Sequence, residues 1–181
     1  MKTLVIGAGY VGLGNALVLA SKFKTHIIDT DINKVSLINS FVCPIDEEEA
    51  GALLKKNSKN ISASTELIEN SNDYNFCIIA TPTNFEEDKN SFNTESIELV
   101  LKELNKINFQ GVVVIRSTVS IGFTEKIIQT FAKLKIIYCP EFLQEGMTIH
   151  DSYNPSRIIV GGKKQYAELF ISLLRLSLIH I

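Results

Sequence analysis

Short apolar runs alternate with stretches of helical periodicity along most of the 181-residue chain. The runs have the length of strands and are apolar throughout, which is typical of strands buried on both faces. Between them, apolar residues recur every three or four positions, most clearly over residues 94–107. This alternation predicts an α/β fold with a Rossmann-like, doubly wound parallel sheet covered by helices on both faces.

The same pattern sets the expected elements and their bounds. We expect strands at residues 3–7, 26–29, 60–64, 75–81, 111–117, 135–138 and 157–162. We expect helices over residues 10–23, 31–40, 47–57 and 94–107, over a segment from Ile127 to Leu134, and from Lys163 onward. Asp31 is the expected cap of the second helix, residues 65–71 a helical turn, and residues 84–93 a polar loop. Residues 1–162 then form one domain, and residues 163–181 form a terminal helix.

Composition narrows the class of protein without identifying it. The chain is 45% hydrophobic and 21% charged, with a net charge of −2 and no block of basic residues. These values give no electrostatic reason to expect nucleic acid or an anionic membrane as a partner. Three cysteines without close spacing and three scattered histidines predict neither a disulfide framework nor a metal site. A cytoplasmic protein is the simplest expectation.

The sequence GAGYVG at residues 7–12 follows the first predicted strand and opens the first predicted helix. This glycine spacing is that of a dinucleotide-binding turn. Gly7 allows the tight turn, Gly9 leaves room for a diphosphate, and Gly12 lets the helix pack on the strand. The free N–H groups and the dipole of the helix then face the phosphates.

An acid at the end of the second predicted strand strengthens this interpretation. Asp29 lies 20 residues after Gly9, where a dinucleotide fold places the carboxylate that binds the adenosine ribose. Asp29 and Asp31 repel a 2′-phosphate, so NAD is favoured over NADP. Lys34 is either a second contact to the ribose or phosphates or a solvated lysine. A flavin, S-adenosylmethionine or unliganded glycine turn has similar local sequence, and these alternatives stay open.

Three further polar stretches follow predicted strands, at residues 80–84, 116–124 and 139–146. Because ligands of open α/β sheets bind at the carboxyl ends of strands, Thr83, Thr118, Glu141 and Glu145 can converge on one crevice. The alternative is that the threonines cap helices and the glutamates are solvated. One such stretch favours that alternative, whereas three together favour a site.

Several motifs together resemble the UDP-glucose/GDP-mannose dehydrogenase family, and most of all its bacterial UDP-glucose 6-dehydrogenases. They are GAGYVGLGNALVLA, CPIDEEE (43–49), IIATPTNF (78–85), RSTVSIGFT, CPEFLQEG and DSYNPSRIIVG (151–161). The resemblance implies the NAD-binding part of an enzyme that oxidises the C6 hydroxyl of UDP-glucose to a carboxylate with two NAD. It also implies a homodimer for the whole enzyme.

Site residues follow from the same resemblance. The implied NAD contacts are Gly7, Gly9, Tyr10, Val11, Gly12, Asp29, Lys34, Thr83, Thr118 and Glu145. The implied sugar-nucleotide contacts are Glu141, Phe142, Leu143, Gln144 and Glu145. Thr118 and Glu141 are the implied catalytic pair, which positions a water and assists proton transfer.

The family's nucleophilic cysteine lies in a Gly-x-Cys motif, and the 181 residues contain no such motif. Cys139 is not expected to replace it, because nothing in its local sequence activates a thiol. We therefore interpret the chain as a shortened or frameshifted product that binds NAD without turnover. The alternatives are a dehydrogenase of UDP-N-acetylmannosamine, UDP-N-acetylglucosamine or GDP-mannose, and a non-catalytic nucleotide-binding module.

Overall fold

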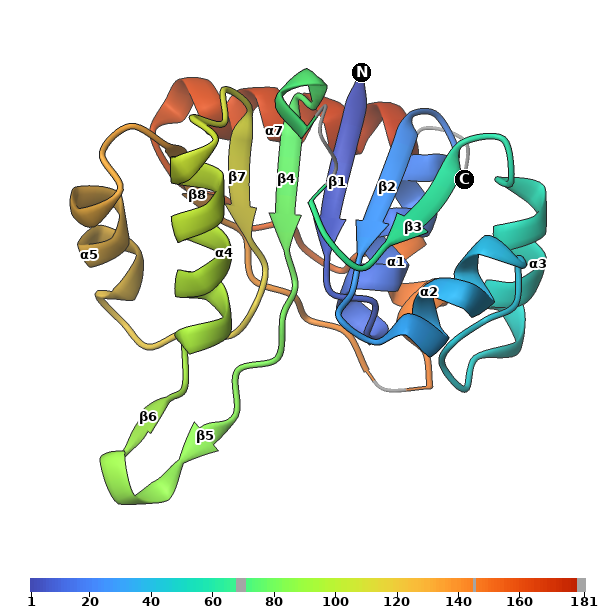
Figure 1. Cartoon of the computed structure of the whole chain (residues 1–181), viewed down its shortest axis with the longest axis horizontal. Coiled ribbons are helices and arrows are strands. Elements are labelled where there is room, and N and C mark those ends of the chain that lie inside the picture. Colours follow the sequence, from blue (N-terminus) through green and yellow to red (C-terminus); the bar gives the residue numbers. More distant parts are fainter. Residues whose placement is uncertain (68–70, 145, 179–181) are drawn as a thin grey trace.

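The computed structural model describes residues 1–67, 71–144 and 146–178, and its centre is a seven-stranded sheet (Figure 1). The strand order is β3-β2-β1-β4-β7-β8-β9. The strands are β1 (Lys2–Ile6), β2 (Lys24–Ile28), β3 (Ile61–Ser64), β4 (Phe76–Ile79), β7 (Val112–Ile115), β8 (Lys135–Tyr138) and β9 (Gly161–Gly162). The first six run parallel, which confirms the predicted fold class.

Helices cover both faces of the sheet. They are α1 (Tyr10–Ala20), α2 (Ile32–Asn39), α3 (Glu48–Lys56), α4 (Glu95–Lys106), α5 (Phe123–Thr130), α6 (Thr148–Tyr153) and α7 (Lys164–Leu178). In Figure 1, α4 and α5 lie on the near face, whereas α1 and α7 lie behind the sheet. The arrangement is therefore doubly wound.

The apolar strands are continuous because both of their faces are buried. In β1, Leu4 and Ile6 belong to the core cluster under α4 and α5, whereas Val5 belongs to the cluster on the α1 and α7 face. Alternate side chains of a strand point to opposite faces, so a strand buried twice carries no polar alternation. This is the physical reason why the sequence pattern predicts parallel strands.

The order in which strands are added to the sheet switches sides at β1. This strand pairs with β2 on one side and with β4 on the other. Ile6 at the end of β1 is in register with Ile28 and with Ile79. Loops leaving these three strand ends diverge, and a crevice opens between them. The glycine loop at residues 7–12 lies at this point.

Local signals in two helices are confirmed. Asp31 caps α2, since its carboxylate accepts the N–H of Asn33 at 2.9 Å. In α4, Ile97, Leu101 and Leu104 are fully buried on one face. A side-chain cap and a single apolar stripe are properties of the local sequence, which is why both were predictable.

The expected polar loop at residues 84–93 is wrong in detail, because the segment forms a hairpin. Strands β5 (Phe85–Glu86) and β6 (Ser91–Phe92) pair antiparallel around a 3-10 turn at Glu87–Lys89. Phe85 and Phe92 pack edge to face with ring centroids 5.4 Å apart, and Asn90 supplies the left-handed residue of the turn. In Figure 1 the hairpin projects away from the sheet, beyond the carboxyl end of β4.

The end of the chain differs from the expectation at three places. Only Gly161–Gly162 of the expected strand 157–162 pairs with the sheet, and it runs antiparallel to β8. Ile158 and Ile159 before it are 42% and 49% exposed and pack into no sheet. Helix α6 was not predicted, because six residues are too few to show helical periodicity. Helix α5 ends at Thr130, before the expected Leu134.

Two expectations fall partly outside the described residues. Residues 68–70 of the helical turn expected at 65–71 are outside the described residues. Beyond them, Ser71–Asp73 form a 3-10 turn. Residues 179–181 are also outside the described residues. Helix α7 before them buries Phe170 and Leu173 in the core and exposes Leu169 and Leu176.

Candidate functional site

A cleft of 440 Å³ lies at the carboxyl ends of the central strands. Most of the residues predicted for a site line it, although they come from separate segments of the chain. The lining residues are Gly7, Gly9, Tyr10, Val11, Asp29, Lys34, Ala80, Thr81, Pro82, Thr83, Arg116, Ser117, Thr118, Glu141, Leu143 and Thr148. The tertiary fold therefore brings the glycine loop, the acid after β2 and the three polar stretches to one place.

The glycine loop shapes one end of the cleft. Gly7 adopts φ +102°, and a Cβ there meets the carbonyl oxygen of Ala80 at 2.5 Å. A Cβ on Gly12 meets the carbonyl oxygen of Gly7, so this glycine permits the close packing of α1 on β1. Around Gly9, by contrast, no atom lies within 4 Å of a built Cβ. Gly9 thus leaves open space in the cleft, as a bound diphosphate requires.

Helix α1 presents its N-terminus to this space. Gly9 is its N-cap, with no side-chain cap and no acidic residue in the first turn. The first N–H groups of a helix have no intrahelical partner, and the helix dipole makes this end positive. An anion such as a diphosphate is therefore stabilised at this end.

Asp29 extends the loop site toward β2. Its carboxylate accepts the N–H of Ala8 at 2.6 Å through Oδ2 and the N–H of Asp31 at 2.9 Å through Oδ1. These two bonds fix the carboxylate beside the glycine loop and leave lone pairs on both oxygens for ribose hydroxyls. Lys34 also lines the cleft, so the structure places it near the same ligand end.

The threonines of the second half do not cap helices, which excludes the alternative given above for them. The N-cap of α4 is Thr94 and that of α5 is Gly122. Thr83 and Thr118 instead line the cleft, after β4 and β7 respectively. Thr118 is exposed, so its hydroxyl is accessible to a ligand.

Glu141 is held in a buried polar network, so it is not a solvated surface glutamate. It forms an ion pair with Arg116, and Asn15 Nδ2 donates to Glu141 Oε1 at 2.8 Å. The exposed fractions of the Arg116 and Glu141 side chains are 9% and 15%. Within the described residues no hydrogen bond engages Glu141 Oε2, which leaves that oxygen for a water or a ligand hydroxyl.

Arg116 and Asn15 were missed by the sequence reasoning, although the sequence carries a signal for each. Asn15 is the only polar side chain between Gly12 and Ala20 of a buried helix, and Arg116 directly follows a fully apolar strand. A polar residue in such a position needs a partner. Only the fold shows that both residues have the same partner.

Cys139 contacts this network but is not an activated nucleophile. Arg116 Nη1 lies 2.6 Å from Cys139 Sγ. Burial raises the pKa of the Cys139 thiol, and the nearby guanidinium opposes that rise only in part. Burial likewise lowers the pKa of Arg116. A buried thiol with a raised pKa is a poor nucleophile, which is a physical reason not to expect Cys139 to act in catalysis.

The predicted sugar-nucleotide residues divide between two neighbouring cavities. Glu141 and Leu143 line the main cleft, and both also line a second cavity of 200 Å³ together with Phe142 and Gln144. Arg157, which the sequence reasoning did not select, places its guanidinium 4.0 Å from the centroid of the Phe142 ring. Glu145 lies outside the described residues.

Other classes of site receive no support from the described residues. Residues 1–67, 71–144 and 146–178 contain no group of three histidine, cysteine or acidic side chains that could hold a metal ion. Each helix in these residues is too short or too polar to cross a membrane.

The fold and the cleft together define a dinucleotide-binding domain with an additional buried charged network. Comparison with known proteins agrees with this class. Residues 1–175 match the NAD-binding domain of the UDP-glucose/GDP-mannose dehydrogenase family, and the chain belongs to that family. NAD is therefore its dinucleotide.

Individual relatives cover the chain nearly completely. UDP-glucose 6-dehydrogenase of Campylobacter jejuni is 39% identical over 94% of this chain and 45% of its own length. That of Streptococcus pneumoniae is 37% identical over 93% of this chain and 43% of its own length. The structure of a UDP-glucose dehydrogenase from Pyrobaculum islandicum superposes on 98% of the chain with a TM-score of 0.87 at 24% identity. The chain thus spans less than half the length of the relatives that it matches.

Proposed function

We propose that the protein to which these residues belong is an NAD-dependent UDP-glucose 6-dehydrogenase, and that this chain forms its NAD-binding part. The two relatives described above carry that activity in their names. The reaction takes the C6 hydroxyl to an aldehyde and then, with a water, to a carboxylate. Two electrons leave as hydride at each step, so two NAD are reduced for each sugar.

One observation carries the NAD site, namely the open space at Gly9 between an uncapped helix N-terminus and Asp29. A diphosphate placed there receives N–H groups from α1, and the adenosine ribose then reaches Asp29. The negative charge of Asp29 and Asp31 disfavours a 2′-phosphate. The other half of the dinucleotide extends across the switch point toward Thr83 and Thr118. Bound NAD supplies the hydride acceptor.

We propose that Thr118 and Glu141 act on the reacting end of the substrate. Glu141 is anchored through Oε1, and among the described residues no hydrogen bond engages Oε2, so this oxygen can accept a proton from a water or an alcohol in the cleft that Glu141 lines. Arg116, which also lines the cleft, holds this carboxylate in place through the ion pair. Phe142, Leu143 and Gln144 form the adjoining wall for the sugar nucleotide. We also propose a cytoplasmic location, which agrees with three free thiols.

The cofactor site is tested by calorimetric titration of the chain with NAD and NADP, in the wild type and in Asp29→Ala. We expect NAD to bind the wild type more tightly than NADP, and Asp29→Ala to lose about tenfold in NAD affinity, since a charge-assisted bond is removed. Equal affinity for NAD and NADP contradicts the role given to Asp29. The variant Asp46→Asn, which removes an acid that does not line the cleft, serves as the control.

Substrate turnover is tested separately by the absorbance of NADH after UDP-glucose and NAD are added. We expect no steady turnover from the 181-residue chain. Its three thiols are Cys43, Cys77 and Cys139, and burial raises the pKa of each. Steady NADH formation shows that catalysis needs no activated cysteine and overturns that expectation. A panel with UDP-N-acetylmannosamine, UDP-N-acetylglucosamine and GDP-mannose in the whole protein tests the sugar.

A further inference from the structure

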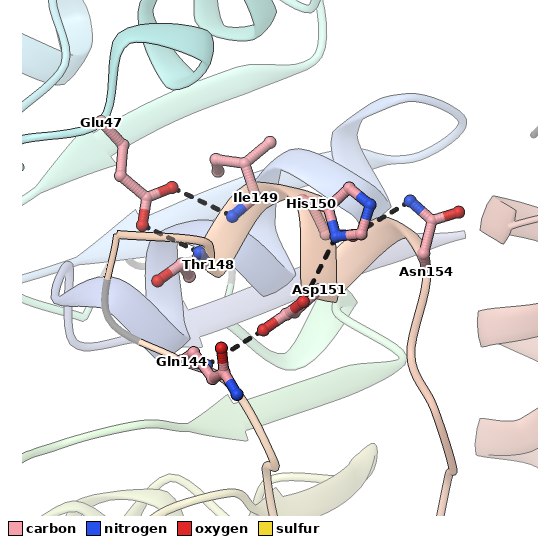
Figure 2. A network of polar contacts seen from close by, with 7 residues as sticks. All are labelled: Glu47, Gln144, Thr148, Ile149, His150, Asp151 and Asn154. Carbon is pink, nitrogen blue, oxygen red and sulfur yellow. Dashed lines mark hydrogen bonds and ion pairs between the residues drawn. The ribbon is translucent and has the colours of Figure 1, made fainter.

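Glu47 lies outside the cleft, and its side chain does not serve its own helix. It is the N-cap residue of α3, yet its carboxylate makes no hydrogen bond to the N–H groups of that helix. Instead, Oε1 accepts the N–H of Thr148 and Oε2 accepts the N–H of Ile149, each at 3.0 Å. Figure 2 shows this bidentate contact, which joins two segments about a hundred residues apart in the sequence.

The N-terminus of α6 has no side-chain cap of its own, so Glu47 supplies the acceptor from another segment. The N-cap residue of α6, Met147, has no side-chain acceptor. Thr148 and Ile149 are 0% and 3% exposed, so water cannot readily satisfy their N–H groups. A buried, unpaired N–H is costly, and a charged acceptor at a helix N-terminus gives a strong hydrogen bond. Glu47 therefore determines how this end of α6 is held.

Helix α6 has little freedom to shift on its other side. It packs against α1 at Gly14, where a built Cβ meets the side chain of Ser152 and lies 3.1 Å from Thr148 Cγ2. This close approach explains why residue 14, which lies outside the dinucleotide motif at residues 7–12, is a glycine. The helix is thus fixed between α1 and Glu47.

Residues 141–144 beside the cleft are hydrogen-bonded to the same helix through Gln144. Asp151 in α6 accepts the N–H of Gln144 at 3.0 Å (Figure 2). The carbonyl of Gln144 accepts the N–H of Met147, also at 3.0 Å. The bond from the Gln144 N–H is the main reason why the pKa of Asp151 is lowered. Gln144 directly follows Leu143, which lines the main cleft with Glu141 and Thr148.

We propose that Glu47 is a positioning residue for the half of the cleft beyond the switch point, and that it acts through α6. Its carboxylate sets the position of α6, and α6 sets that of residues 141–144. This inference rests on the proposed NAD site, because it assigns Glu47 to the nicotinamide end of that site. Glu47 itself touches neither the dinucleotide nor the substrate.

A purely structural cap and a positioning residue predict different binding patterns. ADP occupies only the glycine loop and Asp29, whereas NAD also extends across the switch point into the half of the cleft that Leu143 and Thr148 line. General destabilisation weakens ADP and NAD alike or leaves both unchanged. Loss of positioning weakens NAD and spares ADP.

The experiment is calorimetric titration of the full chain with ADP and with NAD, in the wild type, Glu47→Ala, Glu47→Asp and Asp46→Asn. We expect Glu47→Ala to weaken NAD about tenfold and ADP less than about twofold. Glu47→Asp, which keeps the charge on a shorter side chain, should recover part of the NAD affinity. Asp46→Asn removes the adjacent acid, which forms no hydrogen bond or ion pair with α6 among the described residues, and should leave both affinities unchanged.

The inference is overturned if Glu47→Ala binds NAD as the wild type does, or if it loses ADP and NAD affinity equally. If Glu47→Ala does not fold, Glu47→Gln carries the same test, since it keeps the side-chain length and one acceptor oxygen. Asp151→Asn, which weakens the link to Gln144, should reproduce the selective loss of NAD to a smaller extent. A wild type that binds neither ADP nor NAD refutes the proposed function itself.

Discussion

The two halves of the cleft are built from different materials. At the β1 and β2 end, the glycine loop leaves space for a ligand, and the carboxylate of Asp29 after the next strand accepts an N–H group of that loop. At the β4, β7 and β8 end, the wall is made of charged and polar side chains from distant segments, and the mostly buried Arg116 and Glu141 line it together with Thr83 and Thr118. The first half needs only the right local geometry, whereas the second needs the whole fold.

The difference suits two tasks. A diphosphate is common to all dinucleotides, and main-chain N–H groups at a helix N-terminus bind it without a mobile side chain. Proton transfer needs a carboxylate at a fixed place, and buried partners supply that fixation. Variants that damage one half and spare the other should therefore separate binding of the diphosphate from orientation of the reacting groups.

The largest effect on the free energy of unfolding is expected from breaking the ion pair between Arg116 and Glu141. Arg116→Met leaves the Glu141 carboxylate without its guanidinium in a mostly buried site. We expect the free energy of unfolding in urea to fall by about 3–5 kcal/mol. The double variant Arg116→Met with Glu141→Leu should recover much of that loss, because it removes the unpaired charge as well. Equal losses in the single and double variants contradict the importance of the pair.

An exposed pair provides the matched control for this measurement. Lys106 and Glu103 on α4 form an ion pair whose two side chains are largely exposed. Lys106→Met should leave the urea midpoint nearly unchanged, since solvent screens surface pairs. If Lys106→Met and Arg116→Met lose similar free energies of unfolding, the contribution of Arg116 to stability does not come from its burial.

A smaller effect on stability, but a large one on binding, is expected at the glycine half. Gly9→Val places a side chain in open space, so the thermal midpoint should change little while ADP and NAD affinity fall about tenfold or more. Gly12→Val drives its Cβ into the Gly7 carbonyl and should destabilise the fold itself. Thermal unfolding and titration of the two variants separate these roles. Unaltered ADP binding by Gly9→Val contradicts the diphosphate site.

The smallest effect concerns pH and the strands under the glycine half. His26 bridges β2 and β3, with Nδ1 2.8 Å from Ser62 Oγ and Nε2 2.8 Å from Ser64 Oγ. Burial lowers its pKa below the ordinary 6.5, so the unfolded chain binds the proton more readily. Stability is therefore complete above pH 6.5 and declines as the pH falls toward the lowered pKa of the folded state.

Urea titrations between pH 7.5 and pH 5 measure this decline. The variant His26→Gln should show a flatter dependence over the same range. A slope that persists in His26→Gln assigns the decline to other groups.

The fold was largely predictable because its signals are local. Burial on two faces makes the strands of the sheet continuously apolar, and Asp31 and the stripe of α4 follow rules of neighbouring residues. The errors occur where those signals are weak. Helix α6 is too short to show a period, the hairpin at Phe85–Phe92 depends on one aromatic pair, and residues 158–160 are apolar without entering the sheet.

The sequence by itself determined the glycine loop and the acid that follows β2, because each lies within a few residues of the strand that positions it. Only the tertiary structure decided that Asn15 and Arg116 hold Glu141, and that Glu47 reaches α6. These partners are far apart in the chain. Their pairing follows from how helices pack on the sheet, which no local pattern of residues records.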